Sequence, residues 1–462
     1  MAGSRLSLLL CAVMLGSVSA VHAVEVSPAA AQQLAARAKP DIIVVMVDDM
    51  GAIDQRVLSR LPNIRSIWLQ GGLRFDAAFS ETPLCCPGRA AFLTGQNTRH
   101  HGVTRNIGKL FNPTQSIATA LDDAGYWTVM AGKYFNHSNE IPDKTPNGWD
   151  RVAMMTGYGL TTSTFYIQGV KREMGYKDRA IATQALSWLR AAPAASPVFM
   201  WITPHSPHKY KTLKPFQPSV EDKYKGDPRC ANIQPWKPPN YAWKVRPDGF
   251  PLTRICRALL TTDEMVGALR AEAKAQGRNP YWVFMSDNGM AWGAQGYPLK
   301  NVPAAGRLPL YISGPGIEPR SADALISNID ISPTLVDLAG TSMPWADGLS
   351  FEPLLRGAPG GRDSMLEDHP VGGLDGRGGK TGPWWGIRTP EWHLIEWRGT
   401  KLYNLLEDPW EQHNLSIERP GTVDSLRAMR VQLSPYSPTP TPTPTPSPTP
   451  TSTPEPTPSS TP

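Results

Sequence analysis

Two pairs of Asp or Asn residues stand where apolar segments of the chain end. Asp48 and Asp49 end the first segment, PDIIVVMVDDMG at residues 40–51, and Asp287 and Asn288 end a second, NPYWVFMSDNG. Their carboxylate and amide groups offer only oxygen ligands, which suit a hard cation such as calcium or magnesium. The structural alternative is that each pair caps a helix or closes a turn. Because both pairs follow the same kind of segment, the sequence favours a shared metal site.

A doubled cysteine precedes a proline in SETPLCCPGRAAFLTGQ, residues 80–96. Proline is favoured at the first position of a helix, and the free N–H groups there attract an anion. We therefore expect a helix that begins at Pro87, with Cys85 just outside its positive end and Arg89 one turn in. The alternative is that Cys85 is a buried structural thiol. In an oxidising compartment a thiol is a poor permanent nucleophile.

Strands and helices alternate along the chain and must position these side chains. Apolar runs typical of buried strands occupy residues 40–51, 126–133, 196–205, 279–289 and 308–316. Helical patterns cover Thr114 to Ala124, Asp178 to Ala191 and Thr261 to Ala275. The alternation predicts an α/β fold, with a doubly wound, mostly parallel sheet and helices on both faces. Ligands bind at the carboxyl ends of such strands. The polar residues expected at that edge are Asp48, Asp49, Lys133, His205, Asp287 and Asn288.

The sequence pattern changes after residue 346. Short alternating segments and then a helical pattern follow a glycine-rich loop, so we expect residues 347–433 to form a smaller C-terminal subdomain with a short antiparallel sheet and a helix. Residues 24–346 then form the larger α/β catalytic domain. Residues 434–462 consist mostly of Thr, Ser and Pro and cannot bury apolar surface. We expect them to be a disordered, extended spacer toward a cell wall or a further module.

The first 23 residues have the pattern of a secretory signal peptide. Arg5 precedes the apolar run LSLLLCAVMLG, and SVSAVHA offers cleavage after Ala20 or Ala23. A retained N-terminal anchor is the alternative. No other segment is long and apolar enough to span a bilayer. We therefore predict an exported protein that is secreted, periplasmic or associated with the cell wall.

The charge and the remaining cysteines narrow the function further. The net charge of +6 comes from Lys and Arg scattered without any run, which does not indicate a nucleic-acid partner. It is compatible with an anionic small substrate, and equally with a mildly basic surface that has no function. After removal of the signal peptide, Cys230 and Cys256 could pair in an oxidising compartment, and Cys85 and Cys86 remain.

The segment LCCPGRAAFLTG resembles the sulfatase signature, in which Cys-x-Pro-x-Arg precedes a small-residue helix that ends in Thr-Gly. The matching positions are Cys85, Pro87, Arg89, Thr94 and Gly95. This resemblance implies that a formylglycine-generating enzyme oxidises Cys85 to formylglycine, an aldehyde, and that Cys86 is a bystander. A hydrated aldehyde carries two hydroxyl groups on one carbon, one to attack the substrate and one to expel the product.

The resemblance extends over most of residues 40–433 and implies the other roles at the site. The implied metal ligands are Asp48, Asp49, Cys85, Asp287 and Asn288, with calcium as the expected ion and magnesium as the alternative. The implied sulfate-binding residues are Arg89, Lys133 and Lys300, and His205 is the implied general acid. One position departs from the family pattern: Phe135 stands where many sulfatases carry a histidine, and Asn136 or His137 is expected to replace it.

The sequence thus predicts a secreted, calcium-dependent sulfuric ester hydrolase that cleaves sulfate monoesters of glycans or of aryl alcohols. The doubled cysteine resembles glucosamine-6-sulfatase-like members. Aromatic residues around Trp149, Tyr210 to Trp243 and Trp292 are candidates for substrate contact. One alternative is a metal-dependent phosphodiesterase or phosphonate monoester hydrolase, which tends to carry histidine where this chain has Asn288. The other is a non-catalytic, wall-attached binding protein on the same scaffold.

Overall fold

The computed structural model describes residues 39–52, 55–210, 217–375 and 377–433. The predicted signal peptide, residues 1–23, and the predicted Thr/Pro-rich spacer, residues 434–462, lie outside the described residues. Within the described part of the chain, none of the helices combines the length and the apolar character that a membrane crossing requires.

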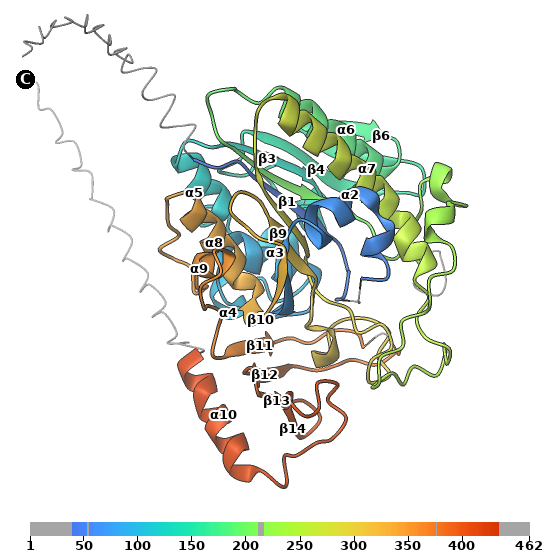
Figure 1. Ribbon diagram of the computed structural model, residues 1–462, viewed down its shortest axis with the longest axis vertical. Coiled ribbons are helices and arrows are strands. Elements are labelled where there is room, and N and C mark those ends of the chain that lie inside the picture. Colours follow the sequence, from blue (N-terminus) through green and yellow to red (C-terminus); the bar gives the residue numbers. More distant parts are fainter. Residues whose placement is uncertain (1–38, 53–54, 211–216, 376, 434–462) are drawn as a thin grey trace, which may run out of the picture.

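A large mixed sheet forms the centre of the molecule (Figure 1). Its ten strands follow the order β10-β2-β9-β8-β1-β7-β3-β4-β5-β6. They are β1 (Ile42–Val47), β2 (Leu73–Phe79), β3 (Trp127–Gly132), β4 (Arg151–Tyr158), β5 (Ser163–Ile167), β6 (Val170–Met174), β7 (Val198–Thr203), β8 (Tyr281–Ser286), β9 (Leu310–Ser313) and β10 (Arg320–Ser327). The central run β8-β1-β7-β3-β4 is parallel throughout, whereas β9 and β5 run antiparallel to their neighbours.

Helices cover both faces of this sheet, because its central strands are apolar on both sides. All residues of β1 are buried. Ile43, Val45 and Val47 pack in the cluster that contains α6 and α7, and the alternate residues of β1 pack in the cluster that contains α3, α5 and α8. Figure 1 shows these two helix layers on opposite sides of the sheet. The helices are α2 (Pro62–Ile64), α3 (Cys85–Thr94), α4 (Thr98–His101), α5 (Ile117–Asp123), α6 (Lys177–Arg190), α7 (Thr253–Ala275), α8 (Ile331–Leu338), α9 (Glu352–Leu355) and α10 (Pro420–Leu433).

A second, smaller sheet follows in the C-terminal part of the chain. It is antiparallel, in the order β11-β12-β13-β14. Its strands are β11 (Met365–His369), β12 (Trp384–Arg388), β13 (Trp392–Glu396) and β14 (Thr400–Asn404). Val423 and Leu426 of α10 pack into the apolar cluster of this sheet. Figure 1 shows the small sheet and α10 at the lower end of the molecule.

The predicted fold class is confirmed: a mostly parallel α/β sheet with helices on both faces and a small antiparallel sheet with a helix. The run at residues 308–316 forms a strand as expected, β9, which runs antiparallel to β8. The described connection between β8 and β9 contains only a short 3₁₀ turn at Pro303–Ala305. Parallel neighbours normally need a crossover helix, and this connection supplies none.

Candidate active site

Four neighbouring strands bring polar residues to one edge of the large sheet. Asp48 directly follows β1, Lys133 follows β3, and Asp287 follows β8. His205 stands two residues beyond the end of β7. Because β8, β1, β7 and β3 are adjacent and parallel, residues far apart in the sequence meet at their carboxyl ends.

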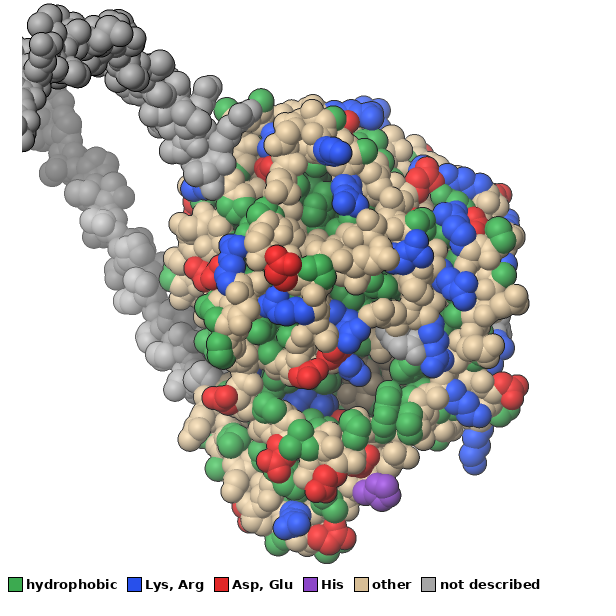
Figure 2. Space-filling view, in the orientation of Figure 1, with side chains coloured by type: hydrophobic (Ala, Val, Ile, Leu, Met, Phe, Trp, Pro, Cys, Tyr) green, Lys and Arg blue, Asp and Glu red, His purple; other side chains and the backbone are tan. Residues whose placement is uncertain are grey.

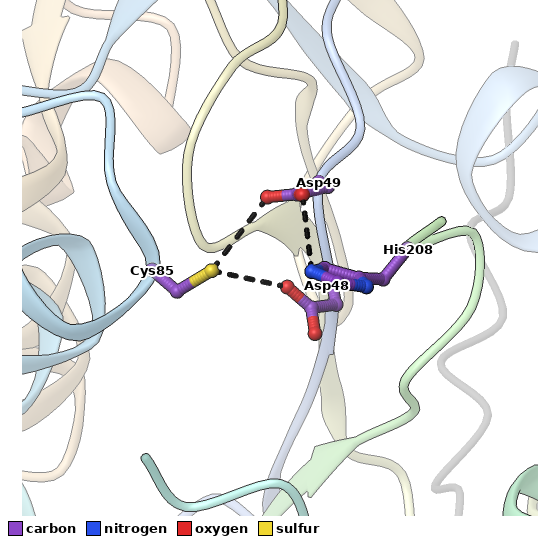
Figure 3. Close-up of side chains that lie close together, drawn as sticks. All are labelled: Asp48, Asp49, Cys85 and His208. Atoms are coloured by element: carbon purple, nitrogen blue, oxygen red, sulfur yellow. Dashed lines mark hydrogen bonds and ion pairs between the residues drawn. The ribbon is translucent and has the colours of Figure 1, made fainter. Parts of the chain in front are cut away.

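The first cysteine of the doubled pair faces two of these carboxylates. The Sγ atom of Cys85 lies 3.6 Å from Oδ1 of Asp48 and 3.7 Å from Oδ1 of Asp49. Figure 3 shows the three side chains pointing toward one another, with His208 on the side away from Cys85 and joined to Asp49. Asp49 adopts a left-handed backbone conformation with φ of 62°, which aspartate tolerates better than most residues.

Two lysines sit against the carboxylates and the thiol. Nζ of Lys133 donates to Oδ2 of Asp48 at 2.6 Å. Nζ of Lys300 contacts Oδ1 of Asp49 and lies 2.7 Å from Sγ of Cys85. Both lysine side chains are largely buried. The Cys85 sulfur therefore lies among closely spaced charges of both signs.

Helix α3 presents Cys85 and Arg89 to the site. It begins at Cys85, so the predicted start at Pro87 was two residues too late; the N–H of Gly88 already donates to the carbonyl of Leu84. Pro87 is tolerated in this first turn because its missing N–H would have no partner inside the helix. A Cβ at Gly88 would lie 1.9 Å from the carbonyl oxygen of Asp287, so glycine permits this close approach of α3 to the end of β8.

Arg89 links the ends of β8 and β3 at the site. Its side chain is completely buried, its Nε donates to Oδ2 of Asp287 at 3.0 Å, and its Nη1 donates to the carbonyl of Lys133 at 2.5 Å. Nη2 lies 3.8 Å from Oδ1 of Asp48 and has no hydrogen-bond partner among the described residues. Because a buried guanidinium needs such partners, Arg89 fixes the relative position of the strand ends.

The residues present fit a hard cation. Asp48, Asp49 and Asp287 are buried carboxylates at adjacent strand ends. Nδ2 of Asn288 donates to Oδ1 of Asp49 at 3.0 Å, which leaves Oδ1 of Asn288 buried without a hydrogen-bond partner among the described residues. An oxygen in that state is suited to coordinate an ion. Asp48, Asp49, Cys85 and His208 each also place one potential ligand atom within 4.8 Å of the others.

The close charges shift the pKa values of these groups in opposite directions. Burial alone would raise the pKa of Asp48, but the cations around it, Lys133 first among them, hold that pKa well below its ordinary value. Burial and the nearby Asp48 raise the pKa of Asp287 to about 6. Burial raises the pKa of the Cys85 thiol well above its ordinary value, although Lys133 and Lys300 oppose this. A cysteine here is therefore a protonated thiol, which is a weak nucleophile.

The sequence predicted a role for only one of the two histidines at the site, His205. Nε2 of His205 lies 3.7 Å from Oδ2 of Asp48, and its ring packs at a tilt of 44° against Tyr158, with centroids 4.0 Å apart. No role was assigned to His208 from the sequence, yet its Nε2 is 3.4 Å from Oδ2 of Asp49. A turn in which the N–H of His208 donates to the carbonyl of His205 at 2.9 Å brings the two rings together. The Ser-Pro pair between them is a turn signal that could have indicated this.

Family models account for most of the chain. Residues 40–341 match the model described as Sulfatase. The chain belongs to the sulfatase family. Residues 303–435 match a second model, described as N-sulphoglucosamine sulphohydrolase, C-terminal. The resemblance stated from the sequence is thus confirmed.

Individual relatives agree with this assignment. The N-acetylglucosamine-6-sulfatase of Capra hircus is 28% identical over 363 residues, which cover 69% of this chain and 64% of the goat protein, so the chain spans less than two thirds of that relative. A protein solved in complex with its substrate D-glucosamine-2-N,6-O-disulfate has a TM-score of 0.68 at 21% identity, covering 85% of this chain and 97% of that one. The phosphonate monoester hydrolase of Silicibacter pomeroyi has a TM-score of 0.63 at 20% identity, covering 86% and 94%. At such identities both structures establish the fold alone.

The departure from the sulfatase pattern at Phe135 has a structural counterpart. Phe135 is buried in the apolar layer beside α5. The N–H of Asn136 donates to Sγ of Cys86 at 3.2 Å, and Oδ1 of Asn136 lies 3.6 Å from the same sulfur. His137 is 60% exposed and pairs with Glu140 instead of facing the site. Of Phe135, Asn136 and His137, it is therefore Asn136 that bonds to a residue of α3.

Two of the aromatic residues predicted to contact substrate belong to the core. Trp149 is 8% exposed and stacks on Phe199 and Trp201. Trp292 is 3% exposed and stacks on Phe250. Their rings fill the interior of this sulfatase-family protein, so the expectation for these two side chains was wrong.

The C-terminal sheet positions one catalytic candidate in a way the sequence did not reveal. Asn301, next to Lys300, has a left-handed backbone with φ of 70°. Its carbonyl accepts the indole N–H of Trp384 at 2.9 Å, and its Oδ1 contacts Nε2 of His369 at 3.1 Å. Both partners lie on the small sheet, so this sheet anchors the loop that carries Lys300.

Proposed function

We propose that this chain hydrolyses sulfate monoesters, with a formylglycine derived from Cys85 as the reactive group and calcium as the bound ion. The observation that supports this best is the arrangement around the Cys85 sulfur. At the start of a helix, this atom is flanked by Lys300 and by the carboxylates of Asp48 and Asp49. An anionic ester that reaches this position meets fixed cations and helix N–H groups.

Each described side chain has a task in this proposal. Lys133 and Lys300 attract the sulfate oxygens and stabilise negative charge on them, as preorganised cations do in many enzymes. Arg89 keeps the ends of β3 and β8 in register, with its Nη2 remaining as a donor beside Asp48. His205 gives a proton to the leaving alcohol.

The metal ligands would be Asp48, Asp49, Asp287 and Asn288, together with the side chain at position 85. A bound calcium ion, or magnesium in its place, would supply Lewis-acid stabilisation of the sulfate oxygens. Formylglycine, once hydrated, would supply a hydroxyl nucleophile that the protonated thiol cannot match. A formylglycine-generating enzyme is the partner that this maturation requires.

The substrate class that we propose is a sulfated glycan containing glucosamine. The goat relative is an N-acetylglucosamine-6-sulfatase, and one structural neighbour was solved with D-glucosamine-2-N,6-O-disulfate. Aryl sulfates are the alternative small substrates. Asn288 supports a sulfatase and not a phosphonate monoester hydrolase. An amide adds no negative charge to the metal site, which therefore suits a monoanionic ester.

We also propose that the protein is exported. The disulfide between Cys230 and Cys256 supports this, because such bonds persist in oxidising compartments. Residues 1–23 would be removed as a signal peptide, and residues 434–462 would extend as a spacer that contacts a cell wall. In the proposed domain division, residues 24–346 form the catalytic domain and residues 347–433 the smaller subdomain.

The reaction class is tested with three esters of one leaving group: 4-nitrophenyl sulfate, 4-nitrophenyl phosphate and bis(4-nitrophenyl) phosphate. We expect kcat/KM to be highest for the sulfate, and Cys85→Ala to abolish its hydrolysis. A clear preference for the phosphate diester would move the protein to the phosphodiesterase class. Binding of sulfated glycan without turnover of any ester would favour the non-catalytic alternative.

A further inference from the structure

Although Lys and Arg form no continuous run in the sequence, one segment beside the site carries a clear excess of them. Residues 204–257, here called the basic segment, contain eleven Lys and Arg against four Asp and Glu, whereas the whole chain has a net charge of only +6. The segment connects β7 to α7 and begins with the two histidines of the site. In Figure 2, Lys and Arg side chains gather along the right-hand side of the molecule, where Figure 1 shows this segment in yellow-green.

A cavity of about 390 Å³ lies within the basic segment, at the beginning of α7. Three of its lining residues are cations, Lys225, Arg254 and Arg257, and none of the described residues that line it is acidic, although Lys225 pairs with Asp222 at 2.7 Å outside the lining. The rest of the lining is largely apolar and includes Phe250 and Ile255. We call this space the α7 cavity. A cavity with apolar walls and clustered cations suits a sugar ring that carries an anionic group.

Among the described residues neither arginine of the α7 cavity forms an ion pair, although the charge of Arg257 helps to lower the pKa of Asp227. Nε of Arg257 is buried without a hydrogen-bond partner among the described residues, and Nε of Arg254 donates only to the carbonyl of Pro218 at 2.8 Å. The nearby Asp227 is engaged by Arg229, which donates to both of its oxygens at 2.9 and 2.7 Å. Burial and the charge of Arg257 lower the pKa of Arg254.

The position of Arg254 and Arg257 on α7 makes their neighbouring positive charges more unfavourable. Arg254 and Arg257 lie in the first turns of α7, a helix of 23 residues. Cations are favoured near the C-terminus of a helix, whereas the N-terminus carries partial positive charge. Two adjacent guanidinium groups at this end repel each other and the helix dipole. A bound anion in the cavity would compensate both effects.

The α7 cavity is connected to the active site by a short pair of backbone segments. His208 lies 3.4 Å from Asp49, and the next residue, Lys209, pairs with Pro218, which lines the cavity. Tyr210 donates its N–H to the carbonyl of Gln217 at 2.9 Å in the same pairing. Only His208 and Lys209 thus stand between Asp49 and Pro218, which lines the cavity, so we expect a short oligosaccharide to reach both sites.

We infer that the α7 cavity is a second anion-binding subsite, which holds a sulfate group on a neighbouring sugar of the glycan whose sulfate ester lies at Cys85. This inference rests on the proposed function. Arg254, Arg257 and Lys225 bind the sulfate oxygens, and the apolar wall contacts the sugar ring. The subsite makes the protein select multiply sulfated chains over monosaccharide sulfates.

The test compares ligands of different length on matched variants. Binding of a multiply sulfated, glucosamine-containing hexasaccharide and of glucosamine 6-sulfate is measured by calorimetry on the full chain carrying Cys85→Ala. Arg257→Gln is expected to weaken hexasaccharide binding by about tenfold, the loss of one charge-assisted hydrogen bond, and to leave monosaccharide binding unchanged. Lys225→Gln, at an exposed position that tolerates substitution, is expected to weaken hexasaccharide binding by a smaller factor.

Lys237 provides the control, since it is an exposed cation of the same segment that does not line the cavity. Lys237→Gln should change hexasaccharide binding less than about twofold, in the range of an exposed charge. Equal losses in the Lys237 and Arg257 variants would overturn the subsite in favour of general attraction. Equal losses of binding for the hexasaccharide and for glucosamine 6-sulfate would also overturn the subsite. No loss of hexasaccharide binding in either the Arg257 or the Lys225 variant would do the same. If Arg257→Gln does not fold, the Lys225 variant decides.

A separate arm distinguishes the source of the anion. Inorganic sulfate should compete only weakly with the hexasaccharide, because it lacks the sugar contacts. If inorganic sulfate binds the cavity as tightly as the hexasaccharide, with the same dependence on Arg257, the cavity is a site for free product and the glycan inference fails. Because binding is measured without turnover, a failure of the proposed reaction class would leave this outcome readable.

Discussion

Replacement of His205 separates proton donation from sulfate binding. Nε2 of His205 is 3.7 Å from Asp48, longer than a hydrogen bond, and Nδ1 is buried without a hydrogen-bond partner among the described residues. His205→Ala therefore removes no strong hydrogen bond of the ring, and its main structural loss is the packing on Tyr158. We expect a folded variant with unchanged metal content whose defect depends on the leaving group.

The size of the defect follows from what each leaving group needs. A nitrophenolate leaves well without a proton, whereas a sugar alkoxide does not, and general acid catalysis contributes about 10²–10⁴-fold. His205→Ala should thus slow hydrolysis of alkyl or sugar sulfates by about that factor and change hydrolysis of nitrophenyl sulfate far less. The assay is kcat/KM for both classes, measured on wild type and variant under the same conditions.

His208→Ala is the matched control. Its Nε2 faces Asp49 at 3.4 Å, and its Nδ1 lies 2.7 Å from the carbonyl of Lys209, so its loss disturbs the carboxylates and not the leaving group. We expect this variant to slow both substrate classes by a similar factor. If His205→Ala also slows both classes equally, His205 positions the sulfate or the loop, and the proton comes from another group.

Three further predictions concern maturation, the metal and the fold. Cys86→Ala should retain much of the turnover that Cys85→Ala abolishes, because the side chain of Cys86 on α3 is buried in the apolar core. Equal loss in both variants would contradict the assignment. Chelation of calcium should lower activity, and Asp287→Ala should weaken calcium binding as measured by calorimetry. Elemental analysis that finds zinc as the native ion would refute the calcium site. Cys256→Ser should lower the free energy of unfolding, measured by urea titration, by about 3.5 kcal/mol. This is the loop-closure value for a disulfide between residues 26 positions apart. An unchanged midpoint of unfolding would argue against the disulfide.

The sequence predicted the convergence at the sheet edge because it follows from one rule. In α/β folds, strands that are apolar on both faces mostly pair in parallel, and the carboxyl ends of such strands meet at one edge. Asp48, Lys133, His205 and Asp287 each stand at such an end, so their proximity needed no knowledge of the strand order. The start of α3 was missed by two residues because Pro87 is equally tolerated later in the first turn.

Other parts of the architecture depend on signals that are weak or distant. The hairpin of β5 and β6 turns at Gln168 and Gly169, both with positive φ, a two-residue pattern that could have been recognised. The anchoring of Asn301 by Trp384 and His369 joins residues about 70 to 80 positions apart in the chain, and no local pattern indicates it. The approach of His208 to Asp49 likewise depends on the geometry of one turn.

The central claim is that Cys85 is the precursor of the reactive group. It is tested most directly by the mass of the peptide that contains residues 80–96, from protein produced together with a formylglycine-generating enzyme and shown to hydrolyse a sulfate ester. Conversion to formylglycine replaces sulfur and two hydrogens by one oxygen, and fragmentation assigns the change to Cys85 or Cys86. We predict the lighter peptide, with the change at Cys85 and an intact thiol at Cys86. An active preparation in which Cys85 is entirely unmodified cysteine would contradict the account.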